Sequence, residues 1–248
     1  MKQVEICCGS YYDALQAQIG GARRIELNSA LYLGGLTPTL ATLIQVKKDT
    51  DLEVICMLRS RGGGFCFNEQ DYLIMKQDCK LLLEHGADGI AFGFLNDNKD
   101  IDEDKTKEIV DLIHSYDKIA VFHRAFDCVN NQRKAIEQLI SLGVNRILTS
   151  GGKSTVMEGI QMIRFLQQNY GHQIEILAGS GINPDNVQII LKQTNINQVH
   201  SSCKQWVLDS TSSTNDVSFG YDSSHLDCYD VVDPNIVSKL VKRVKELE

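Results

Sequence analysis

Eight short apolar segments, each followed by a stretch with helical periodicity, constrain the fold of this chain most strongly. Strands that are buried on both faces of a sheet read as continuous apolar runs, whereas half-exposed strands alternate between apolar and polar residues. The sequence therefore predicts eight repeated strand–helix units. The predicted strands span residues 4–8, 24–28, 53–59, 89–94, 119–125, 146–151, 175–181 and 198–202.

The same short loop recurs between a predicted helix and the next strand. In GARRI, GADGI and GVNRI, a glycine (Gly21, Gly86 and Gly143) precedes the first strand isoleucine by four residues, and Asn195 takes its place in NINQV. Glycine and then asparagine most readily adopt the left-handed conformation that ends a helix. Eight such units in about 250 residues have the size and order of a TIM barrel, and an open doubly wound sheet rarely needs eight. We therefore predict an α/β chain folded as a TIM (β/α)8 barrel.

The chain shows no linker or shift in composition that would divide it. Its 248 residues suit one large domain, so a single domain is expected over residues 1–248. Residues 209–225 are rich in Ser, Thr and Asp and are expected to form a long polar loop after the eighth strand. The last helix is expected over 233–248, because Asp233 is a good N-cap and Pro234 suits a first turn.

The composition of the chain limits the kinds of partner that it is expected to bind. The formal net charge of −7 removes the usual electrostatic footprint of nucleic-acid binding. No apolar run approaches the roughly 18 residues of a membrane span, and the N-terminus starts like a strand rather than a signal peptide. A cytoplasmic protein with no nucleic-acid or membrane partner is therefore expected, and a homo-oligomer is compatible with the sequence. The eight cysteines are then expected to be thiols, and they form no CxxC motif.

Polar residues interrupt or end the predicted strands at the end where TIM barrels carry their sites. Charged groups are costly to bury there unless they are paired or bind a ligand. Carboxylates and imidazoles can transfer protons, so the catalytic candidates are Glu5, Glu26, His123 and Asp127. Arginines and glycine-rich loops favour anions. The candidates for binding an anion or substrate are Arg59, Arg61, Arg124, Ser150, Gly151, Gly179, Gly181, His200 and Ser201.

Purely structural explanations of these residues remain open. Glu5 and Glu26 could pair with Arg59 and Arg124 inside the barrel mouth, since buried ion pairs are often structural. The segment GGKST at 151–155 is not a Walker motif, because Ile147 stands where the first glycine is required. Thr155 and Glu158 are better explained as a helix capping box.

The cysteines suggest a soft metal ion. Cys7 and Cys8 are adjacent on a strand, so their side chains point to opposite faces and cannot bind one ion together. Cys8, Cys66, Cys128 and Cys203 lie at or just beyond strand ends, where two or three could meet across the barrel mouth. Thiolates prefer soft ions such as Cu(I). Buried, inert cysteine is the alternative explanation for most of the eight.

Seven motifs in order, EICCGS, GGLTPT, RSRGGGFCF, FHRAFD, ILTSGGKS, AGSGI and VHSS, resemble the CutC family of copper homeostasis proteins. The resemblance runs from Val4 to about Trp206. It implies a cytosolic TIM barrel that binds copper, with Cu(I) as the bound metal and Cys7, Cys8 and Cys66 as candidate metal ligands.

The chain departs from the family pattern at four positions. Gly64 and Arg23 stand where the family usually has Asp, and Cys203 stands where a small Ala is usual. Cys128 is displaced by one residue. The resemblance therefore does not extend to Cys128 and Cys203 as ligands, nor to a carboxylate in the loop after the third strand.

Two functional hypotheses follow. The first, implied by the resemblance, is a copper homeostasis protein that binds and handles Cu(I) in the cytoplasm. The second is a barrel enzyme, or a binder of a small metabolite carrying phosphate or carboxylate, at the C-terminal barrel mouth. The residues name no substrate, so whether the chain is an enzyme stays open.

Overall fold

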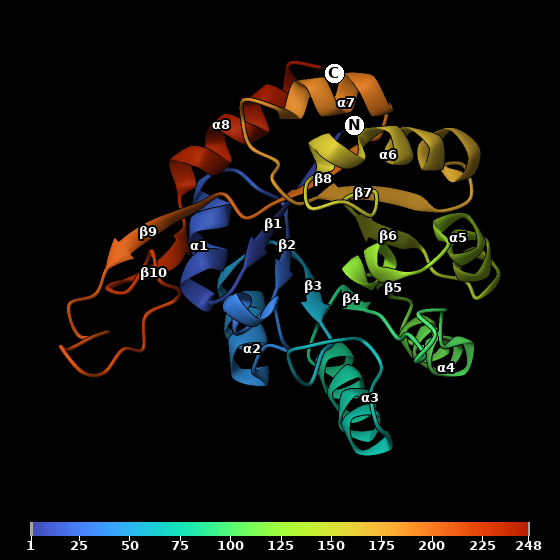
Figure 1. Ribbon diagram of the computed structural model, residues 1–248, viewed down its shortest axis with the longest axis horizontal. Helices are drawn as coiled ribbons and strands as arrows, with labels where there is room; N and C mark the ends of the chain where they lie inside the picture. Colours follow the sequence, from blue (N-terminus) through green and yellow to red (C-terminus); the bar gives the residue numbers. More distant parts are fainter. Residues whose placement is uncertain (1, 248) are drawn as a thin grey trace.

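Eight parallel strands form a closed barrel in sequential order, with helices around the outside (Figure 1). This computed structural model describes residues 2–247. The predicted TIM barrel is confirmed. The barrel strands are β1 (Gln3–Cys8), β2 (Arg24–Leu27), β3 (Glu53–Met57), β4 (Gly89–Phe92), β5 (Ile119–Phe122), β6 (Arg146–Thr149), β7 (Glu175–Gly179) and β8 (Gln198–Ser201). The helices are α1 (Tyr11–Ile19), α2 (Leu40–Asp49), α3 (Glu69–Glu84), α4 (Glu103–His114), α5 (Gln132–Ser141), α6 (Val156–Tyr170), α7 (Val187–Thr194) and α8 (Pro234–Lys245), with short 3-10 turns η1 (Leu31–Leu33) and η2 (Arg124–Cys128).

The recurring loop between helix and strand adopts the predicted left-handed conformation. Its φ angles are 89° at Gly21, 97° at Gly86, 87° at Gly143 and 61° at Asn195. A side chain is strained at such angles except in glycine and, to a lesser degree, asparagine. The four loops therefore end their helices in the same way and return the chain to the barrel.

Successive side chains of each barrel strand point alternately to the helices and to the barrel axis. In β1, Ile6 and Cys8 are fully buried in the large apolar cluster between strands and helices. Glu5 and Cys7 alternate with them and point towards the barrel axis, where Glu5 contacts His200 of the neighbouring strand β8. A separate small cluster of Ile55, Ala91 and Val121 fills part of the barrel interior. The interior is thus partly apolar and partly charged.

A two-stranded antiparallel sheet stands outside the barrel after β8. It pairs β9 (Lys204–Leu208) with β10 (Cys228–Val232) and projects from the side of the barrel near α1 (Figure 1). These strands were not predicted. Within the predicted loop 209–225 the structure has turns, bends and one isolated bridge, Ser213 to Ser218.

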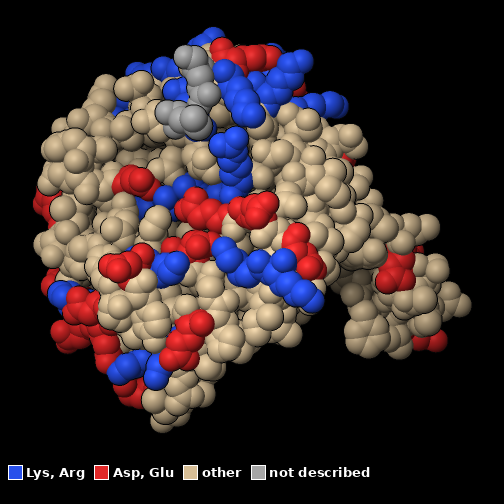
Figure 2. Space-filling model, turned by 180° about the vertical axis from the view of Figure 1, so that it is seen from behind, with Lys and Arg blue, Asp and Glu red and all other residues tan. Residues whose placement is uncertain are grey.

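The face seen in Figure 2 shows the same projecting segment at the lower right, carrying few charged side chains. Several of its apolar side chains are exposed, Phe219 by 86% and Leu208 by 73%. Across the rest of that face, basic and acidic side chains lie side by side (Figure 2), so their charges compensate one another locally.

Helix starts follow their predicted caps. Asp233 accepts a hydrogen bond from the Asn235 N–H and Pro234 begins α8, which ends at Lys245, so the predicted helix over 233–248 is shorter than expected. Residues 1 and 248 lie outside the described residues. The predicted capping box of Thr155 and Glu158 is confirmed at the start of α6. Among the described helices, none combines the length and apolar character needed to cross a bilayer.

Gly159 lets α6 approach the backbone of the β6 loop. A Cβ atom at this position would lie 1.8 Å from the carbonyl oxygen of Ser150. Substitution of Gly159 by alanine is expected to lower the free energy of unfolding by about 1–3 kcal/mol, because backbone must move to admit the methyl group. Urea unfolding measures this loss. The control is Gly64→Ala, where a Cβ would meet nothing within 4 Å; equal stability of the two variants would contradict the prediction.

Candidate functional site

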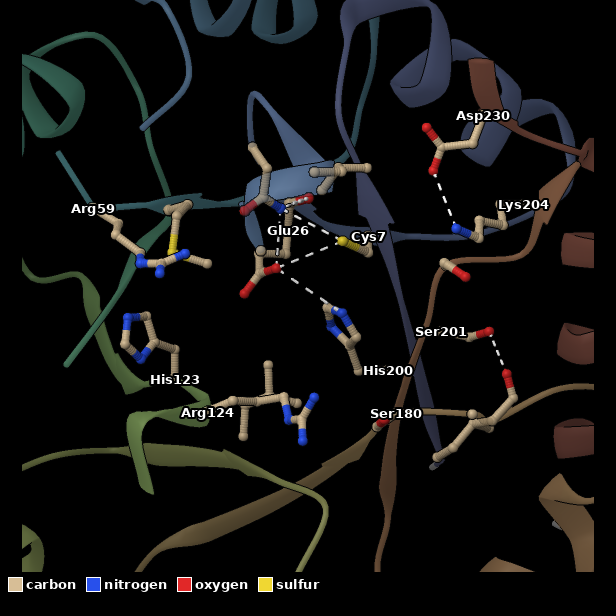
Figure 3. Close-up of a pocket in the computed structure, with 18 of the residues that line it drawn as sticks. Cys7, Glu26, Arg59, His123, Arg124, Ser180, His200, Ser201, Lys204 and Asp230 are labelled. Carbon is tan, nitrogen blue, oxygen red and sulfur yellow. Dashed lines mark hydrogen bonds and ion pairs between the residues drawn. The ribbon is translucent and has the colours of Figure 1, made fainter. Parts of the chain in front are cut away.

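A pocket of about 320 Å³ opens at the C-terminal ends of the barrel strands. Pockets that bind small molecules start at about this volume. Figure 3 shows acidic, basic and imidazole side chains converging on it from several strands. The lining residues are Cys7, Glu26, Asn28, Leu31, Gly34, Met57, Arg59, Phe65, His123, Arg124, Leu148, Ser180, Gly181, Ile182, His200, Ser201, Ser202, Lys204, Tyr221 and Asp230.

A buried ion cluster centred on Glu5 lies in the barrel interior. Glu5 Oε2 is 2.7 Å from Arg24 Nε and 3.9 Å from Arg146 Nη1, and Glu5 Oε1 accepts a hydrogen bond from His200 Nδ1 at 2.9 Å. Burial alone would raise the pKa of Glu5, but Arg24, His200 and Arg146 together lower it to about 2. Glu5 is therefore ionised and fixed in place.

This cluster corrects one structural explanation offered by the sequence. Pairing of the strand carboxylates with Arg59 and Arg124 is wrong, because Glu5 pairs with Arg24 and Arg146 instead. Glu26 accepts a hydrogen bond from Asn28 Nδ2 at 3.0 Å. The residue types were anticipated, but their partners were not.

Cys7, Glu26 and His200 come together at the floor of the pocket. One ligand atom from each lies within 4.8 Å of the other two. The Cys7 thiol donates to Glu26 Oε2 at 3.8 Å, and His200 Nε2 lies 3.9 Å from the same oxygen (Figure 3). These three side chains form a mixed sulfur, oxygen and nitrogen donor set.

The protonation of this set follows from its burial. Burial raises the pKa of Cys7 and of Glu26 above their ordinary values. Burial would lower the pKa of His200, but hydrogen bonds with Cys7 and Glu5 raise it well above the ordinary value. His200 is thus an imidazolium whose Nδ1–H is held by Glu5, which leaves Nε2 facing Cys7 and Glu26.

His123 lies on another wall of the pocket in a different state. It is 3% exposed, and its Nδ1 accepts a hydrogen bond from the Ala125 N–H at 3.1 Å. Burial, and then the charge of Arg59, lower the pKa of His123 to about 3. The imidazole is therefore neutral, with its proton on Nε2.

Arg124, Asp127 and Ser150 form a local network that holds the loop after β6. Asp127 accepts hydrogen bonds from the Ser150 N–H at 3.0 Å and the Gly152 N–H at 3.0 Å. Arg124 Nε donates to Asp127 Oδ2 at 2.8 Å, and its Nη2 donates to Ser150 Oγ at 2.9 Å. Of these residues only Arg124 lines the pocket. The contacts of Asp127 are those of a loop-fixing carboxylate, and the structure does not bring it to the acid–base candidates.

The two arginines that follow β3 lie in different surroundings. Arg59 lines the pocket, whereas Arg61 forms an ion pair with Asp71 at 2.8 Å and is absent from the lining. Of the candidates at or after the ends of β7 and β8, some line the pocket and one does not. Gly181 and Ser201 line the pocket, and Gly179 packs against His200, where a Cβ would lie 3.2 Å from the His200 Cβ.

The three cysteines proposed as metal ligands are not brought together. Cys8 is fully buried, and its thiol donates to the Ile6 carbonyl in the layer between strands and helices. Cys66 is exposed, with its thiol 3.2 Å from Asp97 Oδ1. Only Cys7 reaches the pocket, because the alternation along β1 turns Cys8 outwards and Cys66 lies in a loop.

The CutC family model matches residues 2–205. The chain belongs to the CutC family. A CutC family protein of Treponema denticola is 46% identical over 80% of each chain. The human protein named copper homeostasis protein cutC homolog is 36% identical, over 81% of this chain and 73% of its own length. A crystal structure of a CutC protein from Streptococcus agalactiae superposes with a TM-score of 0.77 at 30% identity, covering 82% of this chain and 99% of that one.

Part of the pocket wall comes from beyond the stretch that the CutC family model matches. Tyr221 and Asp230 line the pocket from the β9–β10 segment. Lys204 Nζ lies 3.5 Å from Asp230 Oδ2 (Figure 3). The sequence signal for this contribution was weak, because polar loop residues carry no periodicity that would indicate their contacts.

Arg24, Asn28 and Arg146 are further site residues of this CutC family member that the sequence analysis missed. A usable signal existed for two of them. In RRIELN, Arg24, Glu26 and Asn28 stand at every second position, so they share one face of β2. Arg146 begins β6 alone and gives no comparable pattern.

Proposed function

We propose that this chain acts in copper homeostasis and binds Cu(I) at the barrel mouth through Cys7 and His200, with Glu26 beside them. Its relatives in mouse and human carry the name copper homeostasis protein cutC homolog. The observation that carries the binding site is the convergence of the three ligand atoms within 4.8 Å. The proposed location is the cytoplasm, where thiols stay reduced.

The chemistry of the donor set fits this ion. Cu(I) prefers soft ligands such as thiolate and also accepts imidazole nitrogen. Cys7 supplies the sulfur and His200 Nε2 the nitrogen, once Cu(I) displaces their protons. Nearby Glu26 supplies negative charge that compensates the metal.

The ion cluster beneath the site supports His200 as a ligand. Metal-bound imidazoles generally donate their second ring N–H to a carboxylate or carbonyl, which fixes the ring. Glu5 accepts this bond from His200 Nδ1 at 2.9 Å, and Arg24 holds Glu5 at 2.7 Å. Since Glu5 holds Nδ1, Nε2 is the ring nitrogen that faces Cys7 and Glu26, and it can bind the ion once its proton is displaced.

The test is a Cu(I) titration of the fully reduced protein in competition with a chromogenic chelator. Wild type is expected to bind one equivalent, and Cys7→Ser is expected to weaken binding at least about a hundredfold, because even the loss of outer partners costs 10–100-fold. His200→Gln is expected to weaken binding in the same direction.

The matched control is Cys66→Ser, which removes an exposed thiol that points to Asp97 rather than to the pocket. This variant should bind Cu(I) as wild type does. Unaltered affinity in Cys7→Ser, or lost affinity in Cys66→Ser, would rule out the proposed site.

A further inference from the structure

Arg59 carries a buried positive charge beside the pocket that no carboxylate among residues 2–247 balances. The side chain is 5% exposed. Its Nη1 donates to the carbonyls of Leu33 and Gly35, and its Nη2 donates to the carbonyl of Gly63. These acceptors are neutral, and among the described residues no acidic side chain forms an ion pair with Arg59. A buried charge in this state is costly unless an anion accompanies it.

Two N–H groups at this wall also lack partners. Arg59 Nε and His123 Nε2 are both buried without a hydrogen bond to any described residue. The His123 proton must be on Nε2, because Nδ1 accepts from the Ala125 N–H. An unsatisfied buried donor costs about 1–3 kcal/mol, so two neighbouring ones indicate a missing acceptor.

The positions of these two groups are fixed by packing. Phe65 packs against both, with its ring centre 5.0 Å from that of His123 and 5.1 Å from Arg59 Cζ. A Cβ atom on Gly93 would lie 2.5 Å from His123 Cε1, so only glycine admits the ring there. Figure 3 shows Arg59 and His123 next to each other on one side of the pocket, away from Cys7.

We propose that Arg59 and His123 bind the carboxylate group of a small organic acid at the barrel mouth. The guanidinium supplies the charge, and the neutral imidazole donates one hydrogen bond from Nε2. The wall beyond is apolar at Met57, Leu148 and Ile182, which suits a short hydrocarbon body. This site is separate from the copper site and does not depend on it.

A carboxylate fits this site better than a phosphate. Among the described residues that line this wall, two buried nitrogen atoms, Arg59 Nε and His123 Nε2, make no hydrogen bond at all, whereas a phosphate offers three oxygens and up to two negative charges. A carboxylate, with a single charge and two acceptor oxygens, matches these two nitrogen atoms.

The test uses copper-free protein labelled with ¹⁵N at histidine, titrated with sodium butyrate and observed by NMR at His123 Nε2–H. A saturable shift is expected with butyrate, while sodium chloride at the same ionic strength gives none. No saturable shift with butyrate, or tighter binding of inorganic phosphate than of butyrate, overturns the proposal.

Two variants localise the contact. His123→Asn keeps an acceptor for the Ala125 N–H, since asparagine is a good N-cap, but its shorter side chain leaves no donor at the position of Nε2. It is expected to weaken butyrate binding about tenfold or more. His114→Asn removes an imidazole that contacts Asn145 outside this pocket and should bind butyrate as wild type does. Equal butyrate affinity in His123→Asn and wild type also overturns the proposal.

Discussion

Replacing Glu5 by glutamine is expected to lower the free energy of unfolding by about 3–5 kcal/mol, because it breaks a buried ion cluster from one side. Glu5 is 2% exposed and stands between Arg24 and Arg146, which are 3% and 2% exposed. Glutamine is nearly the same size but carries no charge, so both guanidinium groups lose their shared buried carboxylate. Urea unfolding at neutral pH measures the loss.

A second ion pair of Arg146 provides a control that separates the effect of burial from the effect of pairing alone. Glu175 also pairs with Arg146, at 2.7 Å, but its side chain is 51% exposed. Exposed pairs contribute about 0–1 kcal/mol, so Glu175→Gln should cost far less than Glu5→Gln. Similar losses in the two variants would show that the buried cluster does not stabilise the fold as described.

Acidification from pH 6.5 to 4.5 is expected to lower the free energy of unfolding by about 2–3 kcal/mol through His123 alone. Its pKa is lowered from 6.5 to about 3 by burial and Arg59. Between these values the unfolded chain binds a proton that the folded chain does not, so stability falls as pH falls. The contribution is complete above pH 6.5 and is lost progressively towards pH 3.

The pH window separates the titration of His123 from that of Glu5. Glu5, with a pKa lowered from 4.5 to about 2, begins to lose its stabilising effect only below pH 4.5. Urea unfolding across pH 4.5–6.5 should therefore show a flatter dependence for His123→Asn than for wild type. Parallel curves for the two proteins would mean that His123 does not titrate as its burial requires.

The barrel could be predicted because its signals are local. Residues 119–122 and 146–149 form strands buried on both sides, so their apolar runs needed no knowledge of their neighbours. The left-handed caps at Gly21 and Gly143 depend only on the residue itself and the helix it ends. Such features can be predicted from the sequence because the backbone conformation requires particular residue types.

The partners within the site could not be predicted because they depend on the stagger of the closed barrel. Alternation along a strand shows which face a residue takes but not its height along the axis. The register places Glu5 beside Arg24 on one side and His200 on the other. Arg59 and Arg124 lie beyond the ends of their strands, so they bind loop groups instead.

Two further departures have equally physical reasons. β9 and β10 are mostly half-exposed or exposed, and β9 carries no fully buried residue, so neither strand has the apolar run that revealed the barrel. The cysteines were grouped by nearness to strand ends, yet Cys8 faces the helices and Cys66 faces Asp97. Ligand type alone does not give side-chain direction.

The filled barrel interior bears on how a ligand reaches the pocket of the described residues. Ile55, Ala91 and Val121 fill the barrel interior together with the ion cluster at Glu5, so the described side chains close the pocket towards the N-terminal ends of the strands. A ligand that binds at His123 or Cys7 therefore enters and leaves at the C-terminal ends of the strands. Tyr221 lines this pocket, so the entry and release of a ligand depend on the segment between β9 and β10, which is not part of the closed barrel.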